Sequence, residues 1–220
     1  MPMTDDDTAL PDERPHDGAL AASPHPDAGA GTSVASGPGV DPVRRRRLLR
    51  TFALLTAGVL LVDQLTKVWA VATLVPGERT PLLGELFGLQ LIRNEGAALS
   101  IASGMTWVLT IVATAVVVVI VRVSRRLGSR GWAVALGLLL GGALGNLVDR
   151  MVREPAPLHG HVVDFLAYWH LFIGNVADIA IVVAAVLVVW LSARGVHVDG
   201  SRDGAADDAS DDAVGREGAA

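Results

Sequence analysis

The stretch LFIGNVADIAIVVAAVLVVWL, residues 171–191, contains a single charged side chain, that of Asp178. An apolar run of this length can cross the hydrocarbon core of a bilayer as one helix. A carboxylate inside such a run is expensive to bury, and intramembrane acids are therefore functional candidates by default. The stretch predicts a membrane-spanning helix and marks Asp178 as a candidate site residue.

Three further segments are long and apolar enough to span a membrane, namely about residues 51–75, 97–121 and 131–148. Helices are the only open-chain structures that satisfy their own backbone polar groups in lipid. The sequence therefore predicts an all-α membrane protein with four transmembrane helices. The segment LFGLQLI, residues 86–92, is expected to form a short strand in a small extracytoplasmic lobe.

The composition also indicates a membrane protein, because 51% of the residues are hydrophobic and the mean hydropathy is +0.44. The net charge of −5 arises at the two ends, since residues 1–43 and 194–220 hold 15 of the 23 acidic residues. Both ends are expected to be disordered tails around a four-helix domain at residues 44–193. There is no cysteine, which excludes disulfides, thiolate nucleophiles and Cys-ligated metals.

Arginines are unevenly distributed over the connections between the predicted spans. Ten of them precede the first span, fill the connection between the second and third spans, or follow the fourth: Arg44, Arg45, Arg46, Arg47, Arg50, Arg122, Arg125, Arg126, Arg130 and Arg194. Positive residues favour the cytoplasmic side of a membrane. Both termini are therefore predicted to face the cytoplasm, and connections 76–96 and 149–170 to face outward.

Two spacings inside the spans predict helix packing. Asp63 and Lys67 are four residues apart and share a helix face, as a structural ion pair or as part of a site. Gly137, Gly141 and Gly145 recur at four-residue spacing in the third span, which lets helices approach closely. We interpret the glycines as packing within one chain and expect a monomer, with dimerisation as the alternative.

Further polar clusters lie near the outward ends of the spans: Asn94, Glu95 and Gly96; Asn146, Asp149 and Arg150; and Asp164 with Asn175. Asn94 could hold a substrate backbone through its amide, or form a turn or helix cap. Asp149 and Arg150 could anchor a helix end, or Arg150 could support a site. Asn175 precedes Asp178 by three residues and shares its helical face.

The pair Asp164 and Asp178 suggests acid–base chemistry. Counted from residue 171, Asp178 is expected roughly 10 Å along the fourth helix at 1.5 Å per residue, whereas Asp164 is expected in a loop. If the loop folds back, two neighbouring carboxyls cannot both ionise easily. The protonated one can polarise a carbonyl while the charged one activates water, which predicts peptide hydrolysis. Alternatively, the Asp178 side chain only makes a polar contact that holds neighbouring helices together.

Other chemistries have weaker support. His159, His161 and His170 could ligate a metal with Asp164, but no HExxH motif occurs. Ser100 lies outside any GxSxG motif. No P-loop, dinucleotide fingerprint or basic aromatic-rich surface occurs, so no nucleic acid is expected. The charges within the spans leave a small proton-coupled membrane transporter as the alternative function, and a non-catalytic scaffold as a third.

Five motifs carry a family resemblance: DQLTK (63–67), NEGAALS (94–100), GNLVDR (145–150), HVVDF (161–165) and NVAD (175–178). The chain resembles lipoprotein signal peptidase, also called signal peptidase II, in which these motifs occur in the same order. Each motif alone is weak, but five in order at the outward ends of four spans form a specific pattern. The resemblance covers about residues 48–192.

The resemblance implies a bacterial inner-membrane aspartyl peptidase that cuts prolipoproteins just before the diacylglyceryl-modified cysteine. It implies that Asp164 and Asp178 are catalytic. It also implies that other motif residues line or brace the pocket: Asp63, Lys67, Asn94, Gly96, Asn146, Asp149, Arg150 and Asn175. Prolipoproteins and membrane lipids are the expected partners, and no metal or organic cofactor is expected. The chain departs from the family at Gly174, where an aromatic residue is usual.

Overall fold

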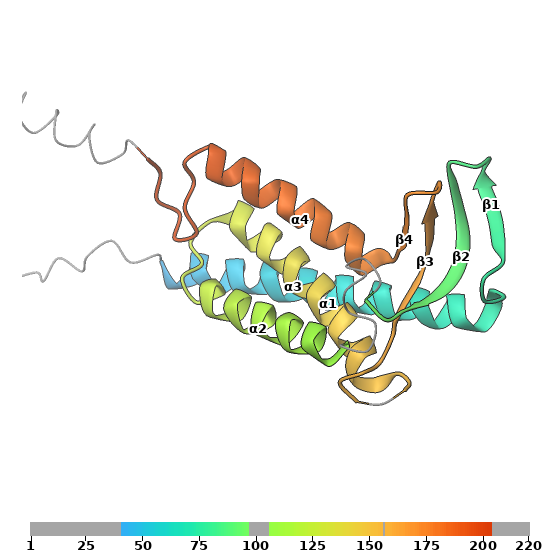
Figure 1. Cartoon of the computed structure of the whole chain (residues 1–220). Coiled ribbons are helices and arrows are strands. Elements are labelled where there is room, and N and C mark those ends of the chain that lie inside the picture. Colours follow the sequence, from blue (N-terminus) through green and yellow to red (C-terminus); the bar gives the residue numbers. More distant parts are fainter. Residues whose placement is uncertain (1–40, 97–105, 156, 204–220) are drawn as a thin grey trace, which may run out of the picture. The chain divides into compact units, whose positions relative to one another are not determined.

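The structure is a computed structural model that describes residues 41–96, 106–155 and 157–203. Within these residues, four helices are long and apolar enough to cross a membrane (Figure 1). They are α1 (Pro42–Thr73), α2 (Thr106–Ser124), α3 (Arg130–Val152) and α4 (Val176–Ala193). The predicted four spans are confirmed. Predictions that concern residues 1–40, 97–105 and 204–220, including most of both tails, lie outside the described residues.

The first helix begins at Pro42, well before the predicted boundary at residue 51. Asp41 caps it, because its side chain accepts a hydrogen bond from the backbone N–H of Val43 at 3.0 Å. Proline is favourable in a first turn, where its missing N–H leaves no bond unmade. The arginines at residues 44–47, predicted to precede the first span, therefore lie in the first turns of α1.

Helix α3 contacts each of the other three helices and carries much of the buried core. The glycines of α3 explain how the neighbouring helices can approach it so closely. A Cβ atom on Gly141 would lie 2.7 Å from Cβ of Val59 in α1, and one on Gly142 would lie 2.6 Å from the carbonyl oxygen of Ala177 in α4. Packing within one chain, predicted from the glycine spacing, is confirmed.

The outer faces of α1, α2 and α4 carry large apolar side chains without partners. Leu61, Val119 and Val186, one from each helix, are about 60% exposed. Such faces would be unfavourable in water, whereas lipid tails cover them without penalty. Together with the length of the helices, they define a multi-pass membrane protein.

A four-stranded antiparallel sheet joins the two longer connections, so the protein is not purely α-helical. The strands β1 (Arg79–Leu83), β2 (Phe87–Asn94), β3 (Val162–Tyr168) and β4 (Phe172–Gly174) lie in the order β1-β2-β3-β4. The predicted strand at residues 86–92 is confirmed as β2. The predicted loop around Asp164 is wrong, because VVDFLAY forms β3, where Asp164 pairs with Ile92. β-branched and aromatic residues favour a strand there.

The fourth helix begins at Val176, not at residue 171, because the residues before it form β4. Asn175 is the N-cap: its Oδ1 accepts from the backbone N–H of Asp178 at 3.1 Å, and Oδ2 of Asp178 accepts from the N–H of Asn175 at 3.0 Å. This is a capping box. Asp178 therefore lies in the first turn of α4, and the predicted depth of about 10 Å along the helix is wrong.

Residues 195–203, which the composition placed in a tail, fold back against the start of α3. We call them the C-terminal strap. The indole N–H of Trp132 donates to the carbonyl of Val196 at 2.7 Å, and the backbone N–H of Gly128 donates to Val198 at 2.8 Å. Nε2 of His197 lies 2.8 Å from Oδ1 of Asp203, which closes the strap on itself.

The contact between α1 and α3 can be tested with two glycine substitutions. We expect Gly141→Ala to lower the free energy of unfolding by about 1–3 kcal/mol, because its Cβ overlaps Val59. Thermal unfolding in detergent measures the effect. Gly58→Ala is the matched control, since nothing lies within 4 Å of its added Cβ, and a helical alanine is favourable there. Equal stability of the two variants would contradict close packing at Gly141.

Candidate active site

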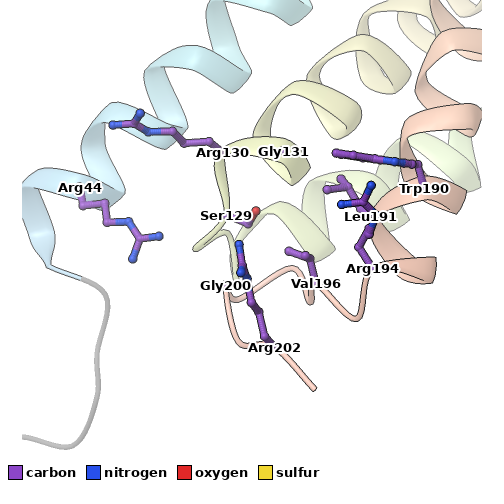
Figure 2. A pocket seen from close by; sticks show the side chains of 10 residues that line it. All are labelled: Arg44, Ser129, Arg130, Gly131, Trp190, Leu191, Arg194, Val196, Gly200 and Arg202. Carbon is purple, nitrogen blue, oxygen red and sulfur yellow. The ribbon is translucent and has the colours of Figure 1, made fainter. Parts of the chain in front are cut away.

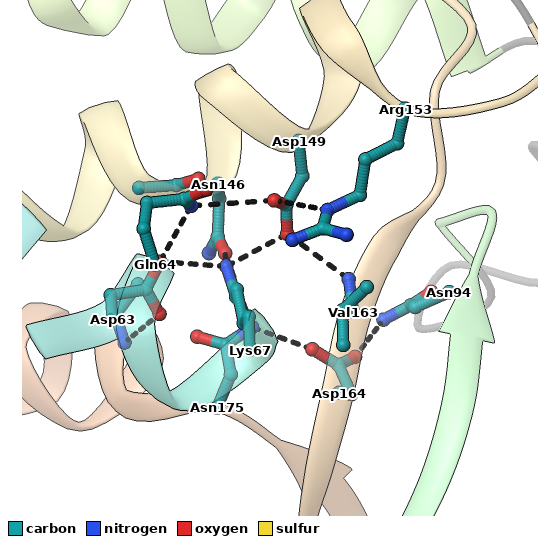
Figure 3. Close-up of polar contacts among 12 residues, drawn as sticks. Asp63, Gln64, Lys67, Asn94, Asn146, Asp149, Arg153, Val163, Asp164 and Asn175 are labelled. Atoms are coloured by element: carbon teal, nitrogen blue, oxygen red, sulfur yellow. Dashed lines mark hydrogen bonds and ion pairs between the residues drawn. The ribbon is translucent and has the colours of Figure 1, made fainter. Parts of the chain in front are cut away.

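Asp164 on β3 is almost fully buried, with 1% of its surface exposed. Its Oδ2 accepts a hydrogen bond from the amide of Asn94 at 2.7 Å, and its Oδ1 accepts one from the amide of Asn175 at 2.6 Å (Figure 3). Burial raises the pKa of Asp164 to about 6, and the negative charge of Asp178 adds to this, against the two amide donors. The carboxyl therefore titrates near neutral pH.

Asp178 in the first turn of α4 is held by two amide groups. Its Oδ1 accepts from the side-chain amide of Asn146 at 2.9 Å, and its Oδ2 accepts from the backbone of Asn175. Asn175 also donates to Asp164, so this one residue contacts both acids. The structure therefore brings both predicted acids into contact with Asn175, although Asp164 comes from a strand and not from a loop.

Beside the two acids lies a buried cluster of ions. Nζ of Lys67 is 2.9 Å from Oδ2 of Asp63 and 2.9 Å from Oδ2 of Asp149, and none of the three side chains is exposed. Lys67 also donates to Oδ1 of Asn146 at 3.0 Å, so all three ammonium hydrogens have an acceptor. The predicted ion pair between Asp63 and Lys67 is confirmed. The third residue of the cluster, Asp149, comes close to Lys67 only through the tertiary fold.

The acids of this cluster also hold the backbone next to the candidate catalytic acids. Oδ1 of Asp63 accepts from the N–H of Ala177 at 3.0 Å, immediately before Asp178. Oδ2 of Asp149 accepts from the N–H of Val163 at 3.1 Å, immediately before Asp164. The ion cluster thus fixes the position of both Asp164 and Asp178 through their neighbours.

Two other predicted residues have different roles. Gly96 has a φ of +110°, and its N–H donates to Oδ1 of Asn94 at 2.8 Å, so the turn expected at Asn94 forms. Asn94 therefore both shapes a turn and contacts Asp164. Arg150 lies within electrostatic reach of Asp164 and Asp178, but its buried Nη1 has no hydrogen-bond partner among the described residues. The supporting role expected of Arg150 stays a prediction.

Sequence reasoning missed Gln64. Its Nε2 donates to the carbonyl of Gly145 at 3.0 Å and lies 3.1 Å from Asp63 and 3.3 Å from Asp149. The Gln64 amide therefore supplies a further hydrogen-bond donor to the two carboxylates of the ion cluster. The signal for this role was present, because Gln64 is an uncharged polar residue directly after Asp63 inside a predicted span.

A cavity of about 220 Å³ opens beside Asp178 along α4. Apart from Asp178 and Asn175, its lining is apolar or aromatic: Tyr168, Phe172, Ile179, Val182 and Val183. The rings of Tyr168 and Phe172 stack with centroids 4.8 Å apart. The cavity therefore joins an apolar wall directly to one of the two acids.

The histidines considered as metal ligands do not gather at the acids. Nε2 of His161 lies 3.9 Å from Oε1 of Glu95, a residue that is itself largely exposed. Over residues 41–96, 106–155 and 157–203, no group of three or more His, Asp or Glu side chains lies close enough to hold a metal ion.

The fold and site define a multi-pass membrane protein with one buried carboxyl, Asp164, and one half-buried carboxyl, Asp178, which lines an apolar cavity. The profile of the signal peptidase II family matches residues 55–194. The chain is 51% identical over 166 residues to a lipoprotein signal peptidase of Rhodococcus jostii, covering 74% of this chain and 82% of that one. It is 53% identical over 160 residues to one of Mycobacterium avium, covering 72% and 85%.

Among solved structures, a bacterial membrane enzyme is similar with a TM-score of 0.57 and 28% identity, covering 64% of this chain and 92% of that one. The chain therefore belongs to the signal peptidase II family. It is an aspartic peptidase of the membrane, and the family removes signal peptides from lipoprotein precursors. None of these comparisons supports the transporter alternative.

The ion cluster generates a stability prediction. We expect Lys67→Met to lower the free energy of unfolding by about 3–5 kcal/mol, because it leaves the buried Asp63 carboxylate without a cation and removes one of the two cations beside Asp149. Denaturant titration in mixed micelles measures the loss. Arg153→Met is the control, because it removes a cation from Asp149 at a site that is 18% exposed. Equal losses in the two variants would contradict a central role for Lys67.

Proposed function

We propose that Asp164 and Asp178 are the catalytic pair with which this chain hydrolyses the bond before the diacylglyceryl-modified cysteine of prolipoproteins. The observation that carries this proposal is the position of Asn175. Its side-chain amide donates to Asp164 at 2.6 Å, while its backbone N–H donates to Asp178 at 3.0 Å. One buried and one half-buried acid held by the same residue support a pair of neighbouring carboxyls of the kind that aspartic proteolysis uses.

The two carboxyls share one proton in the active form. The ionised carboxyl takes a proton from water as the water oxygen attacks the scissile carbonyl carbon. At the same time the protonated carboxyl donates its proton to the carbonyl oxygen. The tetrahedral diol then collapses. The C–N bond breaks as one carboxyl gives its proton to the leaving nitrogen and the other, ionised carboxyl takes a proton from a diol hydroxyl, which restores the single shared proton. Because the two groups interact, they titrate as a pair.

The apolar cavity beside Asp178 supports a lipid-embedded substrate. Ile179, Val182 and Val183 line it and are at the same time accessible from the outer face of α4. A precursor can therefore approach laterally, with its apolar parts along α4 and its scissile bond at the acids. Binding of the remote apolar parts would position that bond.

The remaining motif residues act by positioning. Asn94, Asn146 and Asn175 direct their amide groups at the two acids. Asp63, Lys67 and Asp149 form the ion cluster behind them, and Gly96 permits the turn that carries Asn94. Arg150 adds positive charge near the pair.

We further infer a monomer in the bacterial inner membrane, with residues 44–193 as the spanning domain. The arginines support cytoplasmic termini, because they gather at the start of α1, around the α2–α3 connection and at the end of α4. Asp164 and Asp178 lie toward the opposite helix ends, which supports an active site near the outward face.

The first activity prediction concerns the two acids. We expect Asp164→Asn and Asp178→Asn each to reduce cleavage of a diacylglyceryl-modified precursor by about a thousandfold or more, because an amide neither activates water nor shuttles a proton. Gel analysis of precursor cleavage by the purified, folded variants measures this. Glu85→Gln, an exposed acid between β1 and β2, is the matched control. Near-normal turnover by either aspartate variant would remove that residue from the catalytic pair.

The second activity prediction concerns pH. The raised pKa of Asp164 means that its proton is kept below about pH 6 and lost above it. We therefore expect kcat/KM to fall as pH rises through an apparent pKa near 6. Asn94→Ala removes a donor that favours the ionised carboxyl, so its alkaline limb should move to higher pH. A limb that stays in place or moves to lower pH would contradict the role of Asn94.

A further inference from the structure

A second cavity, of about 590 Å³, lies at the arginine-rich end of the helices. Residues from the start of α1, the start of α3, the end of α4 and the C-terminal strap line this open cavity (Figure 2). Its wall residue Trp190 follows Asp178 by twelve positions, which is roughly 18 Å along α4 at 1.5 Å per residue. The cavity is therefore separate from the candidate active site.

Four arginines line this cavity: Arg44, Arg130, Arg194 and Arg202. No acidic residue lines it, and none of the four forms an ion pair within the part of the chain that the structure describes. Like charges around one cavity repel each other unless an anion lies between them. The four arginines are exposed to solvent, and their common sign of charge favours an anionic ligand over a cationic or neutral one.

The start of α3 adds further donors to the same cavity. Ser129 is the N-cap of this 23-residue helix, yet its side chain makes no capping hydrogen bond. The first N–H groups of a helix have no partner within it, and the helix dipole makes this end positive. Helix starts of this kind bind phosphate groups. The Ser129 hydroxyl is available to the same ligand.

The rest of the lining distinguishes an amphiphile from a soluble anion. Trp190, Leu191 and Val196 form apolar walls, and the guanidinium of Arg194 lies 5.0 Å from the centroid of the Trp190 ring. Tryptophan and arginine at the ends of spanning helices mark the headgroup layer of a bilayer. The strap that carries Arg202 is fixed, because Trp132 donates to Val196.

We propose that this cavity binds the phosphodiester headgroup of an anionic phospholipid. The arginines and the start of α3 contact the phosphate oxygens, and the glycerol lies against Trp190 and Leu191. Arginine suits this task because its planar fork bonds two phosphate oxygens at once. Basic pockets between spanning helices bind such headgroups in the same way.

The test uses the full-length protein in neutral detergent, with native mass spectrometry to count bound phosphatidylglycerol or phosphatidylcholine. We expect one tightly retained phosphatidylglycerol and no matching phosphatidylcholine adduct. The double variant Arg194→Gln/Arg202→Gln should weaken this binding roughly tenfold or more. The control Arg46→Gln/Arg47→Gln removes two charges at the same end outside the cavity, and it should change binding less than twofold.

Three results would overturn the proposal. Equal loss of phosphatidylglycerol from both double variants would mean diffuse surface charge and no defined site. Displacement of the lipid by inorganic phosphate at comparable concentration would mean a soluble anion site. Binding that appears only after removal of residues 204–220 would mean that the acidic residues of this chain occupy the cavity. Cleavage of a lipidated precursor is measured separately, so failure here leaves the catalytic assignment intact.

Discussion

The buried ammonium group of Lys67 is the contact on which the rest of the structure depends. A cation without access to water is stable only if each of its hydrogens has an acceptor and its charge is balanced. Asp63, Asp149 and Asn146 meet this requirement, and they tie α1 to α3 at one fixed height. The same two acids then hold the backbone at the start of α4 and on β3. Helix packing and site geometry therefore have a common origin.

Lys67 also sets the direction of the hydrogen bonds that reach the acids. Because an ammonium group can only donate, Oδ1 of Asn146 must accept from it, and the amide nitrogen of Asn146 is left to face Asp178. Asn175 donates to the same oxygen and to Asp164. Burial raises the pKa of Asp164, whereas these donors oppose the rise, and the balance near pH 6 suits a group that must exchange a proton.

The sequence predicted what local periodicity encodes. Apolar runs gave the four spans, and four-residue spacing gave both the Asp63–Lys67 pair and the glycine contacts of α3. The sequence could not predict that Asp149 completes the ion cluster. Asp149 and Asp63 are far apart in the chain, and no spacing rule links them. Two errors were avoidable. The loop predicted around Asp164 is a strand, and VVDFLAY has strand composition. The fourth helix was predicted to begin too early, although the N-x-x-D pattern at Asn175 is a capping box that marks a helix start. A hydropathy window merges β4 with α4, since both are apolar.

The two ends of the helices handle charge in opposite ways. At the active-site end, every charge of the ion cluster is balanced by another side chain of this protein, and the resulting bonds leave the carboxyls little freedom. Such internal balance suits catalysis, which needs fixed geometry. At the other end, four arginines surround a cavity without a carboxylate among the described residues. There we propose that the balancing charge comes from an anionic lipid headgroup at the bilayer surface.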